Sequence, residues 1–467
     1  MIARNLQWAC DAVSGRFLGD NDRCPTRAFR GVSTDTRKVR PGELFVALSG
    51  PNFDAHDFVG QALSSGAPGA VVREQYRHEG EPADGCLIGV DDPLTALGDL
   101  ARAHRRDYDI PVVAITGSMG KTTTKEMIGA ILRVHFGRVL VTQGNLNNRV
   151  GLPLTIFGLE PDHDAAVLEM GMSEPGEIRE LARIGEPTIG VVTNVAEVHL
   201  EVLPDADAIA EAKAELLEAF TENHTAILNA DDARVLAMGR NKPFAVRTFG
   251  LADGADCRAT DIQTRGEEGV SFTLHLSGET RDVRLSIVGR HNVSNALAAA
   301  LTGRTVGASL DEIVTGLESF RPADKRSCVL RLRGACVIDD TYNANPSSMR
   351  AALATLTDLS HDLRRVAVLG EMKELGVKAA AAHRDLGIAA AEAGVHRLIV
   401  IGPYAGQVAE GAEEAGLDKE AITIAQTHDE IVALLRDELT DKDAVLIKGS
   451  RGARMEKVVE GLREGGN

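Results

Sequence analysis

The sequence has few of the features that mark membrane, secreted or nucleic-acid-binding proteins. Only 4% of its 467 residues are aromatic, and it has one Trp, so it offers few rings to stack on single-stranded bases. No apolar run approaches the roughly 18 residues that a membrane-spanning helix needs. The first residues, MIARNLQWACDAVSGRF, lack the apolar stretch of a secretory signal. These absences favour a cytoplasmic enzyme without membrane insertion.

Cysteine and positive charge are also limited. The six cysteines, at positions 10, 24, 86, 257, 328 and 336, show no CxxC spacing and no zinc-binding cluster with His. In so long a chain we expect buried thiols in a reducing compartment. Lys and Arg number 51 against 68 Asp and Glu, a net charge of −17, which disfavours binding to nucleic acid or anionic lipid. An anionic ligand must therefore meet local positive charge.

The length of the chain predicts about three domains, and strand and helix patterns place them at 1–108, 109–322 and 323–467. In the first block, apolar runs 42–48 and 69–72 predict strands on either side of a helix over 58–65. Strand candidates in the second block are 112–116, 165–170, 189–195 and 225–230, followed by the strand-rich segment 243–290 and a helix from 291. The third block has strand candidates 336–340, 366–370, 398–402 and 444–449, with helices from 347 and over 379–393. This alternation predicts an α/β fold with a mostly parallel central sheet and a Rossmann-like C-terminal domain.

A phosphate-binding loop is the strongest local signal. The segment TGSMGKTT follows the predicted strand 112–116 and opens a helix. Its glycines allow backbone N–H groups to converge on phosphate oxygens, Lys121 can hold the β- and γ-phosphates, and Thr122 can ligate Mg²⁺. The general P-loop pattern has Gly where Ile115 stands, and the alternative is an ordinary strand–turn–helix corner. We predict ATP binding by Gly117, Ser118, Met119, Gly120, Lys121, Thr122 and Thr123.

Three further residues are candidates for metal chemistry. Glu169 and His199 follow strands whose carboxyl ends meet at one sheet edge, where they can ligate a divalent cation. Either could instead be a solvated strand end or a satisfied core residue. Lys213 falls on the apolar stripe of the helix 205–220, whereas Glu211, Glu215 and Glu218 fall on the opposite, solvated face. A buried lysine must be paired, neutralised or modified, unless its long side chain reaches the surface.

Together these residues resemble the central domain of the Mur ligases, ATP-dependent amide-bond ligases of peptidoglycan precursor synthesis. The family's loop has the shorter form TGxxGKT. The resemblance implies that Glu169 and His199 bind Mg²⁺, and that Lys213 is a carbamylated lysine whose carboxylate supports a second Mg²⁺. Lys121, Lys213 and His199 would then be catalytic. The segment HNVSNALAAA places Asn292 and Asn295 where the family contacts adenine.

The outer segments resemble one branch of this family. GVSTDTRKVRPGELFVALSGPNFDAHDF (31–58) is similar to the uridine-nucleotide domain, with Ser33, Thr34, Asp35 and Arg37 at the UDP segment. Without the resemblance, a capping turn is the simpler interpretation. DDTYNANPSSM (339–349) resembles the motif of the ligases that add D-alanyl-D-alanine to UDP-N-acetylmuramoyl-tripeptide, as do segments 142–153, 369–376 and 446–456. The implied substrate residues are Asn145, Asn147, Asn148, Tyr342, Asn343, Asn345, Lys448, Ser450 and Arg451, while Arg326 and Asp340 would reach the nucleotide.

The resemblance thus implies an acyl-phosphate mechanism that yields UDP-N-acetylmuramoyl-pentapeptide, ADP and phosphate. We expect a monomer that closes about hinges near 108–111 and 321–325. Four other protein classes share part of this sequence pattern: a folylpolyglutamate-synthase-like ligase, the ligase that adds the third amino acid, a P-loop ATPase or kinase, and a non-catalytic relative. Segment 31–58 disfavours the first alternative, and segment 339–349 disfavours the second. The joint presence of Glu169, His199 and Lys213 disfavours the third. The presence of Lys121 and Lys213 disfavours the fourth.

Overall fold

The chain alternates strands and helices throughout, as the α/β prediction requires. The structure, a computed structural model, describes residues 3–19, 22–77, 85–197, 201–360 and 362–464. Its contacts define two units, one of residues 1–115, 136–190 and 215–224, the other of residues 116–135, 191–214 and 225–467. Among the helices of the described ranges, none combines the length and the apolar character needed to cross a bilayer.

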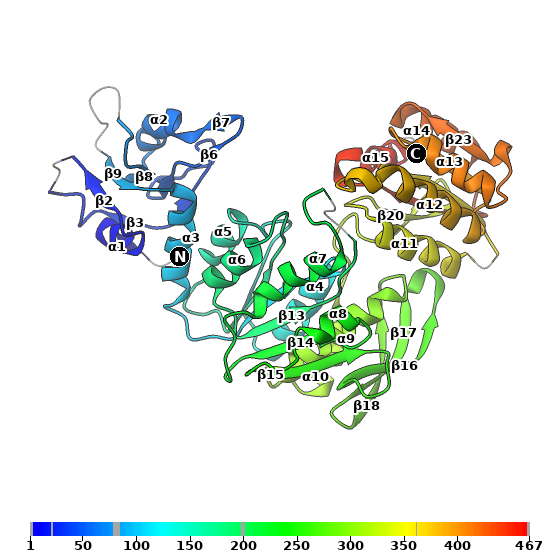
Figure 1. Cartoon of the computed structure of the whole chain (residues 1–467), viewed down its shortest axis with the longest axis horizontal. Helices are drawn as coiled ribbons and strands as arrows, with labels where there is room; N and C mark the ends of the chain where they lie inside the picture. Colours follow the sequence, from blue (N-terminus) through cyan, green and yellow to red (C-terminus); the bar gives the residue numbers. More distant parts are fainter. Residues whose placement is uncertain (1–2, 20–21, 78–84, 198–200, 361, 465–467) are drawn as a thin grey trace. The chain divides into compact units, whose positions relative to one another are not determined.

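A five-stranded sheet lies in the N-terminal part of the first unit, in the order β2-β9-β8-β5-β4 (blue in Figure 1). Its strands are β2 (Arg16–Leu18), β4 (Val32–Ser33), β5 (Leu44–Val46), β8 (Gly69–Arg73) and β9 (Cys86–Val90). β4, β5, β8 and β9 are parallel, and β2 is antiparallel to β9. The other elements are β1 (Arg4–Asn5), α1 (Leu6–Ala12), β3 (Ala28–Phe29), β6 (Ser49–Gly50), β7 (Phe53–Asp54), η1 (Ala55–Phe58), α2 (Val59–Ser64) and α3 (Pro93–Arg105). The predicted strands near 42–48 and 69–72 and the helix near 58–65 are confirmed.

Two of the six cysteines are joined, contrary to the expectation of six buried thiols. Cys24 and Cys86 form a disulfide across 62 residues of sequence. Cys10, Cys257 and Cys336 are free and buried, and Cys328 is free and half-buried. The prediction was wrong for the pair because the fold brings the first residue of β9 against the segment before β3. Cysteine spacing alone does not reveal such a pairing.

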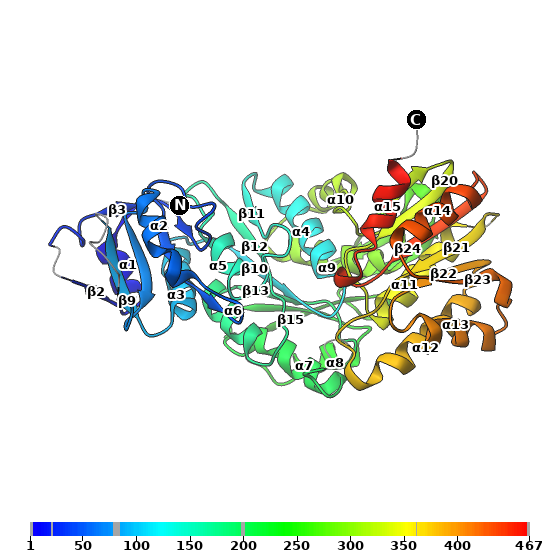
Figure 2. The ribbon, with the colours of Figure 1, turned by 90° about the horizontal axis from the view of Figure 1, so that it is seen from above.

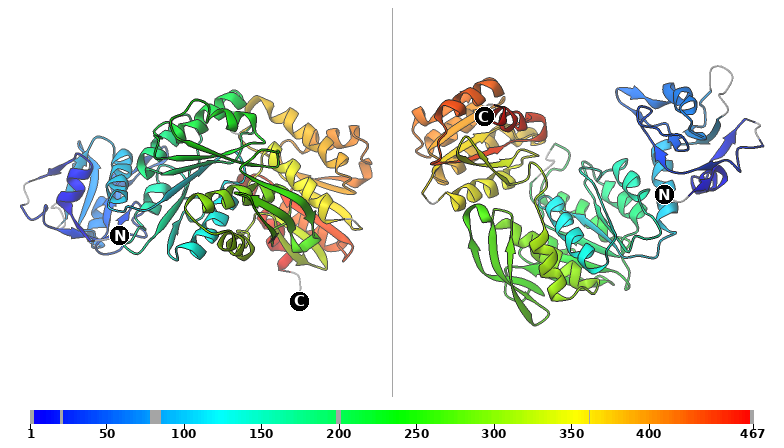
Figure 3. Two further views of the ribbon diagram at one scale, coloured as in Figure 1. Left: turned by 90° about the horizontal axis from the view of Figure 1, so that it is seen from below. Right: turned by 180° about the vertical axis from the view of Figure 1, so that it is seen from behind.

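The central sheet runs in the order β11-β12-β10-β13-β14-β15-β16-β17-β18. Its strands are β10 (Val112–Thr116), β11 (Val139–Val141), β12 (Ala165–Glu169), β13 (Ile189–Val192), β14 (Thr225–Asn229), β15 (Ala245–Gly250), β16 (Cys257–Thr264), β17 (Val270–Leu276) and β18 (Glu279–Leu285). All five residues of β10 are buried, as expected for the interior of a parallel sheet. The strands β16, β17 and β18 form an antiparallel extension (green in Figure 3).

Helices of the same region follow its strands in the α/β manner. They are α4 (Lys121–His135), α5 (Gly151–Ile156), α6 (Glu177–Gly185), α7 (Ala206–Ala214), η2 (Glu215–Leu217), α8 (Ala233–Ala237), η3 (Gly266–Glu268), α9 (His291–Thr305) and α10 (Leu310–Ser319). The long helix α9 is buried along most of its length, because its Ala and Leu residues face neighbours on several sides. The predicted helix from residue 291 is therefore confirmed.

A six-stranded sheet in the order β19-β20-β24-β21-β22-β23 forms the C-terminal part. Its strands are β19 (Cys328–Leu332), β20 (Ala335–Asp340), β21 (Arg364–Leu369), β22 (Arg397–Ile401), β23 (Ile422–Ala425) and β24 (Asp443–Lys448). Only β19, at one edge, is antiparallel to its neighbour among the strands of this sheet in the described ranges. The helices are α11 (Pro346–Leu359), η4 (Gly376–Lys378), α12 (Ala379–Glu392), α13 (Ala405–Glu414), η5 (Lys419–Ala421), α14 (His428–Glu438), η6 (Arg451–Ala453) and α15 (Glu456–Arg463). One face packs on α11, α12 and α13 and the other on α14 and α15 (Figure 2), which gives the predicted Rossmann-like layers.

Candidate active site

The phosphate loop joins β10 to α4, as the sequence predicts. Gly117 has φ +149° and Gly120 has φ +78°, both in a region that side chains disfavour. A Cβ atom on Gly117 would lie 1.9 Å from Thr193 Oγ1, and one on Gly120 would lie 2.2 Å from Asn295 Oδ1. Only glycine therefore fits at either position. The first turn of α4, which starts at Lys121, can offer N–H groups and partial positive charge to an anion.

A neighbouring segment holds this loop through neutral hydrogen bonds. Met119 N donates to Asn194 Oδ1 at 2.9 Å, and Asn194 Nδ2 donates to Met119 O at 3.1 Å. Thr193 Oγ1 donates to the same carbonyl at 2.6 Å, and Ser118 N donates to Asn194 O at 3.0 Å. Thr193 and Asn194 support the loop, and the sequence pattern did not single them out, although they lie in the TNVAEVHLE segment that supplied His199. These hydrogen bonds hold the backbone of the loop in its shape.

Two lysines near this loop differ in exposure. Lys121 is half-buried and its Nζ donates to Gly117 O at 2.7 Å. Lys213 is buried on α7 with Ile209 and Ala212, which confirms its predicted place on the apolar face. Burial and the positive charge of Lys121 lower the pKa of Lys213 well below its ordinary value. This shift favours the neutral amine, the form that reacts with CO₂.

Glu215, predicted to lie on the solvated face with Glu211 and Glu218, is buried. Its carboxylate accepts hydrogen bonds from Gly176 N at 2.7 Å and Arg179 N at 3.1 Å, at the start of α6. The prediction was wrong because α7 ends at Ala214 and residues 215–217 form a 3₁₀ turn. The 3.6-residue period used to assign faces no longer applies there.

Glu169, the last residue of β12, is 2% exposed. Its Oε1 accepts from Asn147 Nδ2 at 2.8 Å, and its backbone N–H donates to Thr142 Oγ1 at 3.0 Å. β12 pairs with β10 in a parallel register that sets Glu169 opposite Ile115, directly before the phosphate loop. His199 lies outside the described residues. Within the described ranges, no three His, Cys, Asp or Glu side chains are grouped as metal ligands.

The remaining residues predicted to bind ATP in this region are largely enclosed. Asn292 and Asn295 are buried, and Asn295 Nδ2 donates to Asn292 Oδ1 at 2.9 Å. Thr124 Oγ1 in turn donates to Asn295 Oδ1 at 3.3 Å, so both amides brace the first turn of α4. Thr122 is buried and Thr123 half-buried, while Asn145 and Asn148 are exposed. Asn148 Oδ1 accepts from Gly151 N at 2.8 Å and so helps to start α5.

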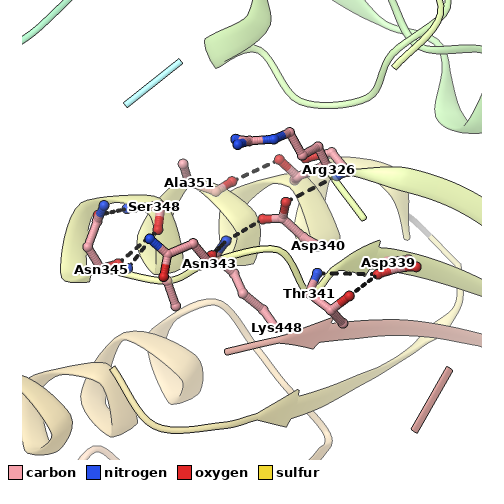
Figure 4. A network of polar contacts seen from close by, with 12 residues as sticks. Arg326, Asp339, Asp340, Thr341, Asn343, Asn345, Ser348, Ala351 and Lys448 are labelled. Atoms are coloured by element: carbon pink, nitrogen blue, oxygen red, sulfur yellow. Dashed lines mark hydrogen bonds and ion pairs between the residues drawn. The ribbon is translucent and has the colours of Figure 1, made fainter. Parts of the chain in front are cut away.

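A buried ion pair organises the turn after β20 (Figure 4). Lys448, at the end of β24, is 2% exposed, and its Nζ contacts Asp340 Oδ2 at 2.5 Å and Asn343 O at 2.8 Å. Asp340 Oδ1 also accepts from Ser327 N at 3.1 Å. The neighbouring Asp339 is buried, and this burial raises its pKa. The structure therefore brings Asp340, predicted at the nucleotide, together with Asn343 and Lys448, predicted at the peptide substrate.

Aromatic and polar contacts complete this turn. The guanidinium of Arg326 lies 3.9 Å from the ring centre of Tyr342, and that of Arg451 lies 5.8 Å from it. Asn345 caps α11 by accepting from Ser348 N at 2.8 Å. Ser450 is buried, and its Oγ accepts from Lys373 N at 2.8 Å. Asn343 and Arg451 are exposed and can meet a ligand, whereas Asn345 and Ser450 hold the loops in place.

The predicted UDP segment follows β4 in the N-terminal sheet. Asp35 accepts from Arg37 through both carboxylate oxygens, each at 2.9 Å, and these hydrogen bonds lower the pKa of Asp35 to about 2. Ser33 is buried and its Oγ donates to Asp35 O at 3.2 Å. Thr34 is half-buried. The segment is a compact turn with an exposed Arg–carboxylate pair.

Phosphate loop and fold together define a nucleotide-binding α/β protein, and comparison with known proteins specifies which kind. Three family models match in order: "Mur ligase family, catalytic domain" at residues 28–105, "Mur ligase middle domain" at 115–303 and "Mur ligase, glutamate ligase domain" at 325–451. The chain is 38% identical to the UDP-N-acetylmuramoyl-tripeptide–D-alanyl-D-alanine ligase of Escherichia coli, with 100% of each chain covered. It is 34% identical to the Bacillus subtilis enzyme of the same name, with 99% of each covered. The chain belongs to the Mur ligase family.

Solved structures agree with this assignment. A crystal structure of MurF from Acinetobacter baumannii has a TM-score of 0.90 at 32% identity, with 99% of each chain covered. The MurF ligase of Thermotoga maritima in complex with ADP has a TM-score of 0.82 at 29% identity, covering 93% of this chain and 97% of that one. The family resemblance inferred from the motifs is confirmed, and ATP is the nucleotide that the family and the ADP complex support.

Proposed function

We propose that this chain is the ATP-dependent ligase that joins D-alanyl-D-alanine to UDP-N-acetylmuramoyl-tripeptide. The products are UDP-N-acetylmuramoyl-pentapeptide, ADP and phosphate. The observation that carries the proposal is the full-length likeness to relatives of that name. The phosphate loop of a nucleotide-binding site, shaped by Gly117 and Gly120, supports it independently.

Each part of the chain has a proposed task. Residues 1–108 bind the uridine nucleotide, 109–322 bind ATP and 323–467 complete the ligase site. The boundaries of the three family matches support this division. We also propose a cytoplasmic monomer that closes on its substrates near 108–111 and 321–325, which would shield the acyl phosphate from water.

The reaction begins at the terminal carboxylate of the tripeptide. A carboxylate oxygen attacks the γ-phosphorus of ATP, the bond to the β-phosphate oxygen breaks, and ADP leaves. Lys121 neutralises the charge that develops on the transferred phosphoryl group. The amine of D-alanyl-D-alanine then attacks the acyl carbon, phosphate departs, and the nitrogen gives up a proton. The amide bond thus forms at the expense of one ATP.

Lys213 enters this scheme as a carbamate. Its neutral amine adds CO₂ and releases one proton, which converts a buried amine into an anionic oxygen donor beside the cation Lys121. Mg²⁺, when bound, would screen the phosphate charges. Thr122, Glu169, His199 and the carbamate of Lys213 would hold it. The hydroxyl and carboxylate oxygens of this set are donors that Mg²⁺ prefers, and the burial of Glu169 leaves a carboxylate suited to such a cation.

The other predicted residues divide by their surroundings. We propose that Ser33, Thr34, Asp35 and Arg37 serve the UDP moiety, and that Asn292, Asn295, Arg326 and Asp340 form the outer part of the ATP site. Exposed Asn145, Asn148, Asn343 and Arg451 are available for the peptide substrates, together with Tyr342. Four other residues are hydrogen-bonded within the protein, and we propose that they act by holding their neighbours. Asn147 holds Glu169, and Asn345 holds Ser348. Lys448 holds Asp340, and Ser450 holds Lys373.

Phosphate release from ATP tests the proposal. The purified protein is given UDP-N-acetylmuramoyl-tripeptide and D-alanyl-D-alanine, each alone and both together, with the tripeptide carrying meso-diaminopimelate or Lys at its third position. We expect phosphate release that requires both substrates, with the mass of the UDP-pentapeptide in the product. Release with neither substrate would indicate a plain ATPase. Release only with UDP-dipeptide and a single amino acid would indicate a sister ligase.

A further inference from the structure

A polar network in the N-terminal sheet involves residues that the sequence analysis did not single out. His56 is 7% exposed, and its Nε2 accepts the backbone N–H of Arg73 at 2.9 Å. Because Nε2 is an acceptor, the proton of the neutral ring is on Nδ1. That proton points to Asp54 Oδ1, 2.6 Å away. The imidazole therefore links Asp54 to the end of β8.

The same carboxylate joins two further side chains. Ser49 Oγ donates to Asp54 Oδ1 at 2.8 Å, and Arg73 Nη2 donates to Ser49 Oγ at 2.7 Å. Arg73 also forms an ion pair with the second oxygen of Asp54. Arg73 is thus tied through its backbone to His56 in η1 and through its side chain to the hairpin of β6 and β7, which together set the direction of its side chain.

The network lies where parallel α/β sheets bind ligands. β4, β5 and β8 are parallel, Arg73 is the last residue of β8, and the hairpin Ser49–Asp54 follows the carboxyl end of β5. Ser33, the last residue of β4, opens the predicted UDP segment at the same edge. Ligands of open parallel sheets gather at this edge.

Arg73 and Arg37 are held by carboxylate and hydroxyl oxygens through different nitrogens of the guanidinium. Arg37 gives Nε and Nη2 to the two oxygens of Asp35, a complete fork-to-carboxylate pair. Arg73 is tied through Nη2 and has a side chain 44% exposed. Within the described ranges, its Nε and Nη1 have no hydrogen-bond partner. These two N–H groups point to different sides of the guanidinium, so each can donate to a separate oxygen of a diphosphate.

We propose that Arg73 binds the diphosphate of the uridine-nucleotide substrate, and that Asp54 and His56 are positioning residues that hold it at the sheet edge. This inference rests on the proposed function, since it assumes that the N-terminal sheet receives UDP-N-acetylmuramoyl-tripeptide. Arg37 lies at the same edge, and its Nη1, which takes no part in the pair with Asp35, can donate to the same ligand. Asp54 and His56 act through Arg73 and need not touch the substrate.

Calorimetric titration with UDP and with UDP-N-acetylmuramoyl-tripeptide tests the role of Arg73. Arg73→Met should weaken binding of both by about tenfold to a hundredfold, the usual effect of losing charged hydrogen bonds. Arg73→Lys should recover part of the loss. Arg30→Met is the matched control, because Arg30 is exposed and precedes β4 at the opposite edge. In turnover, Arg73→Met should raise KM for the UDP substrate alone and leave kcat at saturation within about twofold.

A double-mutant cycle tests the positioning role. Asp54→Asn should weaken UDP binding less than Arg73→Met, and the double variant should bind no worse than Arg73→Met alone. His56→Gln, whose Oε1 can replace Nε2 as the acceptor for Arg73, should bind more tightly than His56→Asn. Additive losses, or equal losses in KM for ATP and dipeptide, would indicate a merely structural role.

The outcomes separate this inference from the function itself. Wild-type affinity for UDP in Arg73→Met overturns the inference while the proposed function stands. Wild-type protein that binds neither UDP nor the UDP-tripeptide overturns the function. Because Arg73 is exposed, we expect its variants to fold with an unchanged thermal unfolding midpoint, so they decide the matter even if Asp54→Asn or His56→Gln does not fold.

Discussion

Lys213 and Lys448 are equally buried, yet their surroundings are opposite. Each is 2% exposed. Lys448 contacts the carboxylate of Asp340 and the carbonyl of Asn343. Lys213 is influenced by the positive charge of Lys121, and its pKa falls well below the ordinary value. Burial alone thus says little about what a lysine does.

The comparison separates a structural charge from a reactive one. A buried ammonium with a carboxylate partner stays charged and fixes the loops around it. Burial beside another cation disfavours the charged form of an amine. The first is a positioning residue of the turn after β20. The lowered pKa of the second favours the neutral form that carbamate formation needs. Substitutions at the two positions should therefore have different consequences.

The largest effect is expected from Lys213→Met. Loss of the carbamate removes a charged group from a phosphoryl-transfer site, which should lower kcat by about 1,000-fold or more. Phosphate release at saturating substrates measures it, and mass spectrometry of the native wild-type protein should find one CO₂ added. Glu211→Gln, on the exposed face of the same helix, is the control. A Lys213→Met enzyme with near wild-type turnover would refute the catalytic role.

Lys448→Met should affect stability most. Its removal leaves Asp340 without its partner in a buried turn, at a cost of about 3 kcal/mol in the free energy of unfolding. Urea titration measures this cost, and Lys442→Met, an exposed lysine of the same domain, should change it little. The double variant Lys448→Met/Asp340→Leu should recover most of the loss. If the single variant is as stable as wild type, the pair contributes nothing.

Lys125→Met should have a smaller effect than Lys448→Met. Lys125 is fully buried and contacts Glu126 Oε1 at 2.8 Å, but the side chain of Glu126 is 27% exposed and keeps access to water after the substitution. We expect a loss of about 1 kcal/mol in the same urea titration, as for pairs with one solvated partner. A loss equal to that of Lys448→Met would show that exposure of the partner does not set the cost.

The smallest expected effect is on how the free energy of unfolding depends on pH. The folded-state pKa of Lys213 lies below the unfolded value, near 10.5, so the unfolded chain binds more protons between these two values. Stability of the wild type, in CO₂-free buffer, therefore falls as pH decreases through this window. Lys213→Met lacks this pH-dependent contribution of Lys213. The free energy of unfolding of the variant should therefore rise relative to that of the wild type as pH falls from 10.5. Urea titrations at several pH values measure it, and a constant difference would contradict the shift.

Local patterns predicted much of this molecule because they depend on neighbours in sequence. The apolar run of β10 and the glycines after it predict a strand, a loop and a helix from only a few neighbouring residues. The structure has these elements at the expected positions. The apolar face that carries Lys213 also follows from one helical period. Glu215 shows where such reasoning stops, because a 3₁₀ turn ends the period one residue before it.

The contacts that hold the sites together depended on the tertiary structure. Three contacts join segments that are far apart in sequence: the disulfide of Cys24 and Cys86, the contact of Thr193 with the phosphate loop, and the ion pair of Lys448 and Asp340. None of these pairings has a local pattern, because each depends on which strands are neighbours in a sheet.

The order of strands and helices, the phosphate loop and the family could be predicted from the sequence, since they depend on composition, hydrophobic period and short motifs. The three-dimensional arrangement was needed to show that Lys448 has a carboxylate partner and that Arg73 is held beside Asp54 at the edge of the N-terminal sheet. The reason is physical: charge and hydrogen-bond state depend on what lies within a few ångströms in space. Sequence distance does not measure that.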